Sequence, residues 1–509
     1  MPTRDPSPLP SEADVVVVGA GFGGLGAALT LAERGARVVL CEALAYPGGC
    51  ASTFTRGGVA YESGATLFSG FAPGQLFAEW IARHGLDVAV DWLDPLVVSR
   101  TPTTEIAVPR ERDALIARFQ ALPDAPRDAI ARFFRLQRKV ADALWRALDD
   151  PALLPPLSPL ALLRHAGRLP AYVPLARLAG RPARVALERC GVDGFAPLVT
   201  FLDALCQITV QCGLDEAEAP VALATMDYYF RGTGHVRGGI GRLAHALAGA
   251  IAAQGGHVAL ANRVRGVEHL ADGRLRVRTR RGDIDAACVV ANLLPQDARA
   301  LCGLAPGDAP ELDRLAAGVE TGWGAAMLYR VVAPPPGFDA PGVHYDLVRD
   351  PAAPLIEGNH VFCSIGEPHP DGSGLRSATV STHLRLDAEH DADPAAHVDR
   401  AHAAMRATLA ALLPEWRVVS ELTASPRTFE RFTRRHRGLV GGVPRRAGLA
   451  AYRHLAPREA APGLWLVGDS VFPGQSTLAT ALGGVKVAEA VARRSLPARR
   501  RPPSQGVGT

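Results

Sequence analysis

The hydrophobic positions near the start of the chain predict a strand, a helix and a second strand. Val15 to Val18 are four β-branched residues in a row, which is typical of a fully buried parallel strand. Residues 25–34 are rich in Ala and Leu and predict a helix that Gly35 ends. Residues 37–41 form a second apolar strand. This segment therefore predicts a βαβ unit.

Glycines at the first strand–helix junction indicate a dinucleotide site. Gly19, Gly21 and Gly24 have G-x-G-x-x-G spacing, and Glu42 ends the second strand. In this pattern the first glycine makes the tight turn, the second lets the backbone approach a pyrophosphate, and the third lets the helix pack on the strand. The helix N-terminus favours phosphates, and Glu42 can accept hydrogen bonds from ribose hydroxyls. A second register, beginning at Gly21, also fits, but the first starts directly at the strand end.

A second Gly-rich segment follows Glu42. Pro47, Gly48 and Gly49 predict one turn, Gly57 and Gly58 predict another, and residues 59–61 form a short strand. A nicotinamide-binding domain does not need this second loop, whereas a flavin must pass close to the backbone. An ordinary surface loop is the alternative interpretation.

The amino-acid composition changes in the middle of the chain. Residues 75–150 have the apolar spacing of helices. Residues 151–184 are rich in proline and leucine, contain five arginines and contain no acid. Such a stretch suits a substrate-tunnel lid that rests on anionic lipid. A set of packed helices broken by proline, with solvated arginines, is the alternative.

Strand and turn patterns return after residue 231. A helix follows a Gly-rich loop, and residues 262–292 predict a β-meander with turns at residues 272–273 and 281–283. We expect its last strand to return to the dinucleotide sheet. Residues 301–425 mix strands and helices without a clear motif.

The C-terminal region also combines a strand, a turn and a helix. Residues 464–467 predict a buried strand that Gly468 and Asp469 close, and a helix is expected from about Ser476 to Arg493. Glycines inside this helix cost about 1 kcal/mol each relative to alanine, which indicates close approach to another group. The basic segment 425–442 receives no chemical role.

Composition narrows the class of protein. A chain of 509 residues has room for two or three domains, and Lys139 and Lys486 are the only lysines among 55 basic residues. The net charge of +4 without basic runs argues against nucleic-acid binding. The eight cysteines form no CxxC pair, which favours a reduced cytoplasmic protein without zinc or disulfides. We expect no signal peptide and no membrane-spanning helix.

The N-terminal βαβ unit, the segment 47–66 and the C-terminal Gly-Asp before a helix form a constellation. The segments VGAGFGGLGAALTLAERGARVVLCEALAYPGG, SPRTFERFTRR and GLWLVGDSVFPGQSTLATALGGVKVAEAVA carry it. The chain resembles the FAD-dependent phytoene desaturase and carotenoid isomerase family of the amine oxidase superfamily. The resemblance spans residues 14–493 and is closest to the carotenoid isomerase and desaturase branch.

The resemblance implies a fold and a division of the chain. The fold class is α/β, with a Rossmann-type FAD-binding domain carrying a β-meander and a discontinuous α+β substrate domain with a helical lid. The expected limits are a disordered lead (1–13), an FAD-binding domain (14–110, 232–300 and 440–495), a substrate and membrane-facing domain (111–231 and 301–439), and a flexible tail (496–509).

The resemblance also implies a non-covalent FAD site. The pyrophosphate is expected to contact Gly19, Gly21 and Gly24, and the pyrophosphate and ribityl chain to pass Gly48 and Gly49. The adenosine ribose is expected to bind Glu42, and the adenine to contact the backbone of Val264. The ribityl or pyrophosphate region is expected to contact Gly468 and Asp469, and the flavin pyrimidine edge to contact Ser476 and Thr477. Two departures stand out: Cys50 replaces the arginine usual after the glycine pair, and His235-Val236-Arg237 replaces an aromatic-proline pair. No metal is expected.

The resemblance implies an FAD-dependent oxidoreductase that acts on a long apolar polyene. The quoted motifs are shared by desaturases and isomerases, and the arginine-rich, lysine-poor composition favours carotenoid desaturation, with oxygen or a quinone as electron acceptor. The alternatives are a carotenoid cis–trans isomerase that uses reduced FAD, and a non-catalytic escort protein for isoprenoid lipids. The expected partners are a polyene and a membrane surface, so the protein is expected in the cytoplasm, peripherally bound to membrane. His235, Asp203 and Asp227 are weak acid–base candidates, each better explained as structural.

Overall fold

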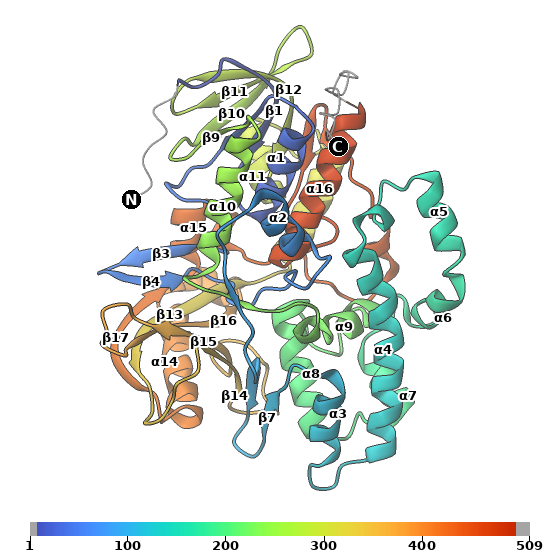
Figure 1. Ribbon diagram of the computed structural model, residues 1–509, viewed down its shortest axis with the longest axis vertical. Helices are drawn as coiled ribbons and strands as arrows, with labels where there is room; N and C mark the ends of the chain where they lie inside the picture. The colour runs from blue at the N-terminus through green and yellow to red at the C-terminus, as the bar shows by residue number, and fades with distance from the viewer. Residues whose placement is uncertain (1–7, 495–509) are drawn as a thin grey trace, which may run out of the picture.

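Two large sheets organise residues 8–494, which the computed structural model describes (Figure 1). The first sheet contains β1 (Glu12–Val18), β2 (Val38–Cys41), β9 (His257–Ala259), β10 (Val264–His269), β11 (Leu275–Thr279), β12 (Asp283–Ala291), β18 (Glu459–Ala461) and β19 (Leu464–Leu466). Six strands follow the order β10-β11-β12-β1-β2-β9, while β19 pairs with β12 and β18 with β19. Of the expected lead and tail, 1–7 and 496–509 lie outside the described residues, and β1 already begins at Glu12.

The register of the first sheet brings the predicted elements together. β1 runs parallel to β2 and to β12, with Val18 opposite Cys41 on one side and Ala291 on the other. The last strand of the meander therefore returns to the dinucleotide sheet, as the sequence predicts. Because β1, β2, β12 and β19 are parallel neighbours, their carboxyl ends meet at one edge of the sheet.

Helices cover both faces of this sheet. The helices associated with it are α1 (Phe22–Glu33), α2 (Leu76–His84), α10 (Ile240–Ala253), α11 (Pro295–Leu301), α12 (Pro310–Glu320) and α16 (Thr477–Arg494). Val15 and Val17 pack with α1, α10 and α16, whereas Val16 and Val18 pack with α12 and the meander. The predicted fold class, a Rossmann-type domain with a β-meander beside a second α+β region, is confirmed.

Glycines allow α1 and α16 to lie almost in contact. A Cβ on Gly484 would lie 2.2 Å from the carbonyl oxygen of Gly23, and a Cβ on Gly26 would lie 2.6 Å from that of Ala481. Any larger side chain would force the two helices apart. The close approach predicted for the glycines inside the last helix is therefore observed.

The second sheet follows the order β17-β13-β16-β15-β14-β6-β7. Its strands are β6 (Val97–Arg100), β7 (Glu105–Val108), β13 (Gly324–Ala333), β14 (Val343–Val348), β15 (His360–Pro368), β16 (Arg376–Leu384) and β17 (Arg417–Ala424). Helix α14 (Pro394–Leu412) packs on one face of this sheet, with α13 (Ala388–Ala392) before it and α15 (Pro426–Thr433) after β17. Two further strand pairs are β3 (Thr53–Arg56) with β4 (Val59–Glu62), and β5 (Val90–Asp91) with β8 (His235–Val236).

The hairpin of β6 and β7 corrects the helical interpretation of residues 75–150. Those residues contain α2, α3 (Arg112–Gln120) and α4 (Arg127–Asp149), but three strands lie between α2 and α3. β6 pairs in parallel with β14, so this hairpin extends the second sheet although it lies within the range 14–110 assigned to the FAD-binding domain. Its partner strand is more than 200 residues away in the sequence, and no local pattern records that pairing.

A helical lobe completes the molecule on the right of Figure 1. Besides α3 and α4 it contains α5 (Pro159–Ala166), α6 (Leu169–Leu178), α7 (Arg184–Cys190), α8 (Ala196–Thr209), α9 (Ala219–Thr225) and the short helix η2 (Tyr228–Phe230). Helices α5 and α6 form the edge of this lobe and project from it.

Candidate functional site

Three glycines shape the turn from β1 to α1. Gly19 has a φ of 95°, and a Cβ there would lie 2.9 Å from the carbonyl oxygen of Asn292. A Cβ on Gly24 would lie 2.0 Å from the carbonyl oxygen of Gly19, so only glycine allows the helix to pack on the strand end. Gly21 lies against the side chain of Asn292, whereas Gly26, which belongs to the second register, packs on α16. The structure therefore matches the register that starts at Gly19.

The N-terminus of α1 opens into a cavity at the edge where the parallel strands end. Gly21 is the N-cap and offers no side chain to cap the helix. Gly21, Phe22 and Gly23 all line the cavity. Because N–H groups of the first turn have no partner within a helix, this end presents donors and a positive dipole to the cavity, which suits a pyrophosphate.

Glu42 lies at the end of β2 in the same cavity. One carboxylate oxygen accepts the N–H of Ala20 at 2.7 Å, and the other accepts the N–H of Leu44 at 2.8 Å. Burial raises the pKa of Glu42, and these backbone hydrogen bonds oppose that rise. Glu42 therefore joins the loop that follows β1 to the loop that follows β2, and it faces the cavity. Val264, at the start of β10, also lines it.

The loop after β2 supplies a glycine-lined wall. The N–H of Gly48 donates to the carbonyl of Ala20 at 2.7 Å, and both Gly48 and Gly49 have positive φ, at 116° and 62°. A Cβ on Gly49 would lie 3.4 Å from the Cα of Gly21. Bare backbone from both loops thus borders one narrow space, which side chains would fill.

Two arginines that the sequence analysis left without a role lie in this part of the cavity. Arg435 forms an ion pair with Asp469 at 2.8 Å, and Arg445 lines the cavity as well. Burial acts to lower the pKa of Arg435, but Asp469 and then Cys50 act to raise it, and the net pKa is raised. Arg435 therefore places a cation beside Cys50, where the related proteins were expected to carry an arginine. The departure at Cys50 is a sequence signal that could have directed attention to a cation elsewhere in the chain.

The N-terminus of α16 also borders the cavity. Ser476 has a φ of 103°, and its hydroxyl accepts the N–H of Ala479 at 3.0 Å. The hydroxyl of Thr477 is buried and has no hydrogen-bond partner among the residues that the structure describes. Gly468, with a φ of 121°, and Asp469 also line the cavity. A polar ligand group at this end would satisfy an atom that otherwise lacks a partner.

The cavity has a volume of about 820 Å³ and extends from these loops into the helical lobe. Its walls change from glycines and arginines to apolar side chains of α4, α8, α9 and β13 along that course. The apolar lining includes Leu144, Trp145, Leu148, Leu154, Ile208, Val221, Met327 and Phe362. One continuous space thus combines a dinucleotide-type end with a long apolar compartment.

One face of the second sheet also contributes to this compartment. His360 and Phe362 of β15 and Ser381 and His383 of β16 line the cavity. Nε2 of His360 lies 2.5 Å from Oδ1 of Asp346, a fully buried residue of β14. The sequence analysis missed this pair, because the two residues lie on different strands and no motif surrounds either.

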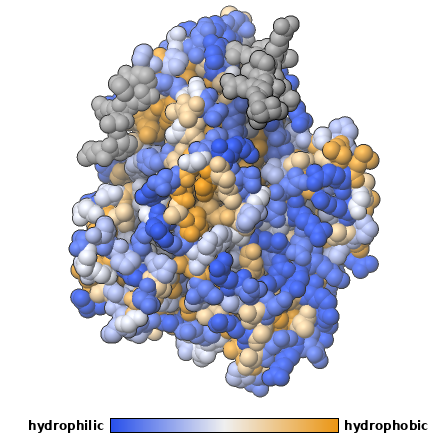
Figure 2. Space-filling model, viewed as in Figure 1, coloured by the Kyte–Doolittle hydropathy of each residue, from blue (hydrophilic) through white to orange (hydrophobic). Residues whose placement is uncertain are grey.

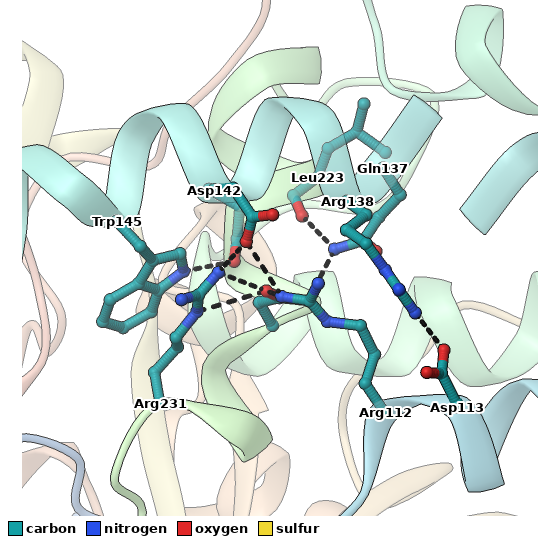
Figure 3. Close-up of polar contacts among 10 residues, drawn as sticks. Arg112, Asp113, Gln137, Arg138, Asp142, Trp145, Leu223 and Arg231 are labelled. Carbon is teal, nitrogen blue, oxygen red and sulfur yellow. Dashed lines mark hydrogen bonds and ion pairs between the residues drawn. The ribbon is translucent and has the colours of Figure 1, made fainter. Parts of the chain in front are cut away.

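The three acid–base candidates from the sequence do not line the cavity. Asp227 is fully buried and pairs with Arg112 and Arg231, and it accepts a hydrogen bond from Gln137 at 2.9 Å. Figure 3 shows these arginines converging from opposite sides beneath Asp142. The cluster joins α4 to the segment after α9 and is structural.

His235 and Asp203 also lie outside the cavity lining. His235 belongs to β8, and burial lowers its pKa. Asp203 of α8 accepts the N–H of Leu214 at 2.7 Å, and burial raises its pKa. Burial in the strand pair explains His235, and the hydrogen bond to Leu214 explains Asp203.

Comparisons with known proteins agree with this architecture. Residues 17–84 match the model of the NAD(P)-binding Rossmann-like domain family. The chain is 26% identical to prolycopene isomerase 1 of an Oncidium hybrid cultivar, over 94% of the chain and 84% of that protein. It is 25% identical to prolycopene isomerase of Arabidopsis thaliana, over 94% and 82%. The resemblance to the carotenoid isomerase and desaturase family is confirmed.

Further similarities of the chain are to enzymes with other names. A match of 84 residues, covering 16% of this chain and 14% of the other protein, is 36% identical to human all-trans-retinol 13,14-reductase. An oxidoreductase from Methanosarcina mazei has the same fold with a TM-score of 0.64 at 18% identity, covering 93% of this chain and 99% of that one. Putrescine oxidase gives a TM-score of 0.63 at 16% identity, covering 95% and 99%. The chain therefore shares its fold with these two oxidoreductases.

Proposed function

We propose that this protein binds FAD non-covalently and acts on an extended apolar polyene of the carotenoid type. The observation that carries the proposal is the single cavity, whose glycine- and arginine-lined end continues into an apolar compartment. The similarity to prolycopene isomerases over most of the chain supports a polyene substrate.

The residues at the polar end fit FAD. The backbone of Gly19, Gly21, Gly48 and Gly49 would border the pyrophosphate, and Arg435 would supply positive charge. The remaining contacts follow the sequence expectation: Glu42 for the ribose, Val264 for adenine, Gly468 and Asp469 for the ribityl region, and Ser476 and Thr477 for the flavin edge. Gly24 serves by packing α1 on β1.

The reaction that we place first is desaturation. When bound, FAD supplies a two-electron acceptor. Removal of two hydrogens from neighbouring carbons also needs a proton acceptor, and the apolar compartment contains a histidine–carboxylate pair in its wall. Oxygen or a quinone would then serve as the final electron acceptor.

Cis–trans isomerisation is the second candidate, because the relatives that match the chain along most of its length are named prolycopene isomerases. An isomerase ends each turnover with the flavin in its starting state and would work only when the flavin is already reduced. A desaturase consumes an acceptor in every turnover.

The expected site of peripheral membrane association is the outer surface of α5 and α6. Leu160, Leu163 and Leu169 are 66%, 71% and 62% exposed, and hydrophobic residues gather over this projecting lobe in Figure 2. Leu148 and Leu154, close to these helices in the chain, line the cavity. A lipid-borne polyene would thus enter from the lobe. Within residues 8–494, no helix combines the length and the apolar character that crossing a bilayer requires.

The test begins with flavin content and then follows the fate of the polyene. Purified protein should be yellow and should release FAD on acid precipitation. With a partly conjugated carotenoid in liposomes and no air, the flavin absorption should bleach and the product should absorb at longer wavelength. A colourless protein that takes up no FAD would leave only a lipid-escort role. A product of unchanged mass, formed only after dithionite reduction, would establish the isomerase instead.

A further inference from the structure

The wall of the apolar compartment contains a histidine that has the surroundings of a proton acceptor. His360 is 3% exposed, lines the cavity and lies in an extended strand that fixes its backbone. Its neighbour on β14 is Asp346, which stands opposite Phe362 and reaches diagonally to Nε2 of His360. The pair is therefore held by two hydrogen-bonded strands rather than by a loop.

The hydrogen bond determines which nitrogen of His360 can react. Nε2 carries the proton that it donates to the carboxylate of Asp346, so Nδ1 of the neutral ring holds a lone pair. Within residues 8–494, Nδ1 has no hydrogen-bond partner. In the same part of the chain, Oδ2 of Asp346 and the hydroxyl of Tyr229 are buried and have no hydrogen-bond partner. A proton taken up at Nδ1 would convert the pair into imidazolium and carboxylate, whose charges cancel inside the apolar wall.

A second histidine in the wall has different surroundings. His383 of β16 lies beside His360, and its Nδ1 contacts Nε2 of Gln207 at 3.2 Å. Burial, and then the neighbouring His360, lower the pKa of His383 to about 3. His383 has no carboxylate partner and stays neutral at working pH. The chain therefore offers His360 as the histidine of this compartment with a carboxylate to stabilise its protonated form.

We propose that Nδ1 of His360 accepts the proton that leaves the polyene and that Asp346 positions the imidazole for that transfer. The assignment rests on the desaturation form of the proposed function. Two neighbouring carbons each lose a C–H bond: one hydrogen leaves with its electron pair as hydride to the bound flavin, and the other leaves as a proton and forms an N–H bond at Nδ1. The electron pair of the second C–H bond becomes the new C=C bond. The polyene is oxidised by two electrons and FAD is reduced by two.

The first test compares His360→Gln with His397→Gln in the holoprotein. His397 is the control, since this buried histidine lies outside the cavity and its Nε2 contacts the partly exposed carboxylate of Glu357 at 3.2 Å. Without air, His360→Gln should slow bleaching of the flavin by carotenoid about 100-fold or more, which is the usual size of a general-base effect. FAD content and the spectral shift of bound carotenoid should stay unchanged in both variants.

The pH profile separates a base from a packing residue. In the wild type, the rate of bleaching should fall at low pH, because a base that already carries a proton cannot accept another, and this fall should be absent in His360→Gln. Asp346→Asn, which keeps the shape but not the charge, should slow bleaching. The other ionisable groups beside the pair are His383 on β16 and Asp203 on α8, which lie near His360, and Tyr229 of η2, which lies near Asp346. If the rate of bleaching in His360→Gln falls at low pH as it does in the wild type, the fall belongs to one of these groups and the assignment is overturned.

A chemical label gives a readout that does not depend on turnover. Diethyl pyrocarbonate should modify His360 of the resting protein, and a bound carotenoid should protect it, as measured by mass spectrometry of peptides. Unchanged labelling with carotenoid present would show that His360 does not face the substrate. Failure of the assignment alone would appear as normal bleaching in His360→Gln. If the wild type itself gives only isomerised product, desaturation and the assignment fail together.

Discussion

At the scale of single residues, the site shows how one position compensates for another. Cys50 follows the glycine pair where the family resemblance implies arginine, and Arg435 brings its guanidinium to the same part of the cavity. Its ion pair with Asp469 keeps the side chain in place. A cation beside bare glycine backbone favours a pyrophosphate, because the backbone N–H groups and the guanidinium act on the same negative charge.

Replacing Arg435 should therefore weaken FAD binding. We expect Arg435→Gln to raise the dissociation constant for FAD about 10-fold or more, equivalent to about 1.4 kcal/mol, because Asp469 loses its partner and the pyrophosphate loses a cation. Fluorescence titration of FAD into the stripped protein measures this change. Arg431→Gln, at an exposed position of the same segment, is the control and should bind as the wild type does. Equal affinities in the two variants would remove Arg435 from the site.

Glu62 should give the stability a pH dependence. Its carboxylate accepts the N–H of Ile240 at 2.9 Å at the start of α10, and burial raises its pKa to about 8, although hydrogen bonds from Ile240 and Thr53 oppose the rise. The folded-state pKa lies above the ordinary value of 4.5, so the stability from protonated Glu62 is complete below pH 4.5 and is lost as pH rises through 8.

Glu62→Gln keeps an acceptor for Ile240 but cannot ionise. Its melting temperature relative to the wild type should therefore increase between pH 5 and pH 8.5, as scanning fluorimetry would show. Glu79→Gln, at an exposed position of α2, should show no such trend. Parallel curves for the wild type and Glu62→Gln would contradict the raised pKa.

At the scale of elements, the contact between α1 and α16 determines how the two helix ends are placed at the site. Both helices direct their N-termini at the cavity, and glycines at their crossing set how closely those ends approach. Such a crossing fixes the spacing of two dipole ends relative to one ligand. The small residues of the two helices thus set the spacing of the helix N-termini as well as the packing of the helices.

A methyl group at this crossing should disturb both stability and cofactor binding. Gly484→Ala would place a Cβ 2.2 Å from the carbonyl oxygen of Gly23, so the helices must shift, at a cost of about 1–3 kcal/mol. We expect a melting temperature lower by several degrees and reduced FAD content. Gly249→Ala in α10 is the control: a Cβ there meets nothing within 4 Å, and the change should be neutral or stabilise by about 0.5–1 kcal/mol. Equal melting temperatures would show that the helices can separate freely.

At the scale of the whole molecule, the lobe relates the cavity to the surface. The acid-free segment 151–184 contains α5 and α6, on which Leu160, Leu162, Leu163 and Leu169 are exposed while Leu178 packs into the core of the lobe. Two of its five arginines form ion pairs, Arg164 with Asp150 and Arg184 with Asp215. The remaining positive charge and the exposed leucines lie on one projecting part, which favours contact with anionic lipid.

Vesicle binding should depend on this lobe. The protein should sediment with vesicles that contain phosphatidylglycerol, less so at high salt, and the triple change of Leu160, Leu163 and Leu169 to Ser should weaken binding about 100-fold or more. Arg177→Glu with Arg181→Glu should reduce it as well. Val418→Ser with Val419→Ser, at exposed positions of β17, is the control. If the leucine variant sediments with vesicles as the wild type does, α5 and α6 do not bind the membrane and only pack within the lobe.

The sequence by itself determined the elements whose constraints are local. The run Val15–Val18, the spacing of Gly19, Gly21 and Gly24, the meander turns and the glycines of the last helix each record a backbone requirement within about twenty residues. Such requirements appear as residue patterns because only glycine tolerates the close approaches at Gly24 and Gly484. The βαβ unit, the meander and the final helix were therefore predictable.

Only the tertiary structure decided which distant residues meet. The hairpin of β6 and β7 joins β14, Arg435 reaches the region of Cys50, and Asp346 holds His360. Each of these contacts joins segments whose own residues are compatible with several partners, so sequence patterns do not select one. Burial of the two sheets selects the partner, because strand pairing and core packing are satisfied together only in the complete fold.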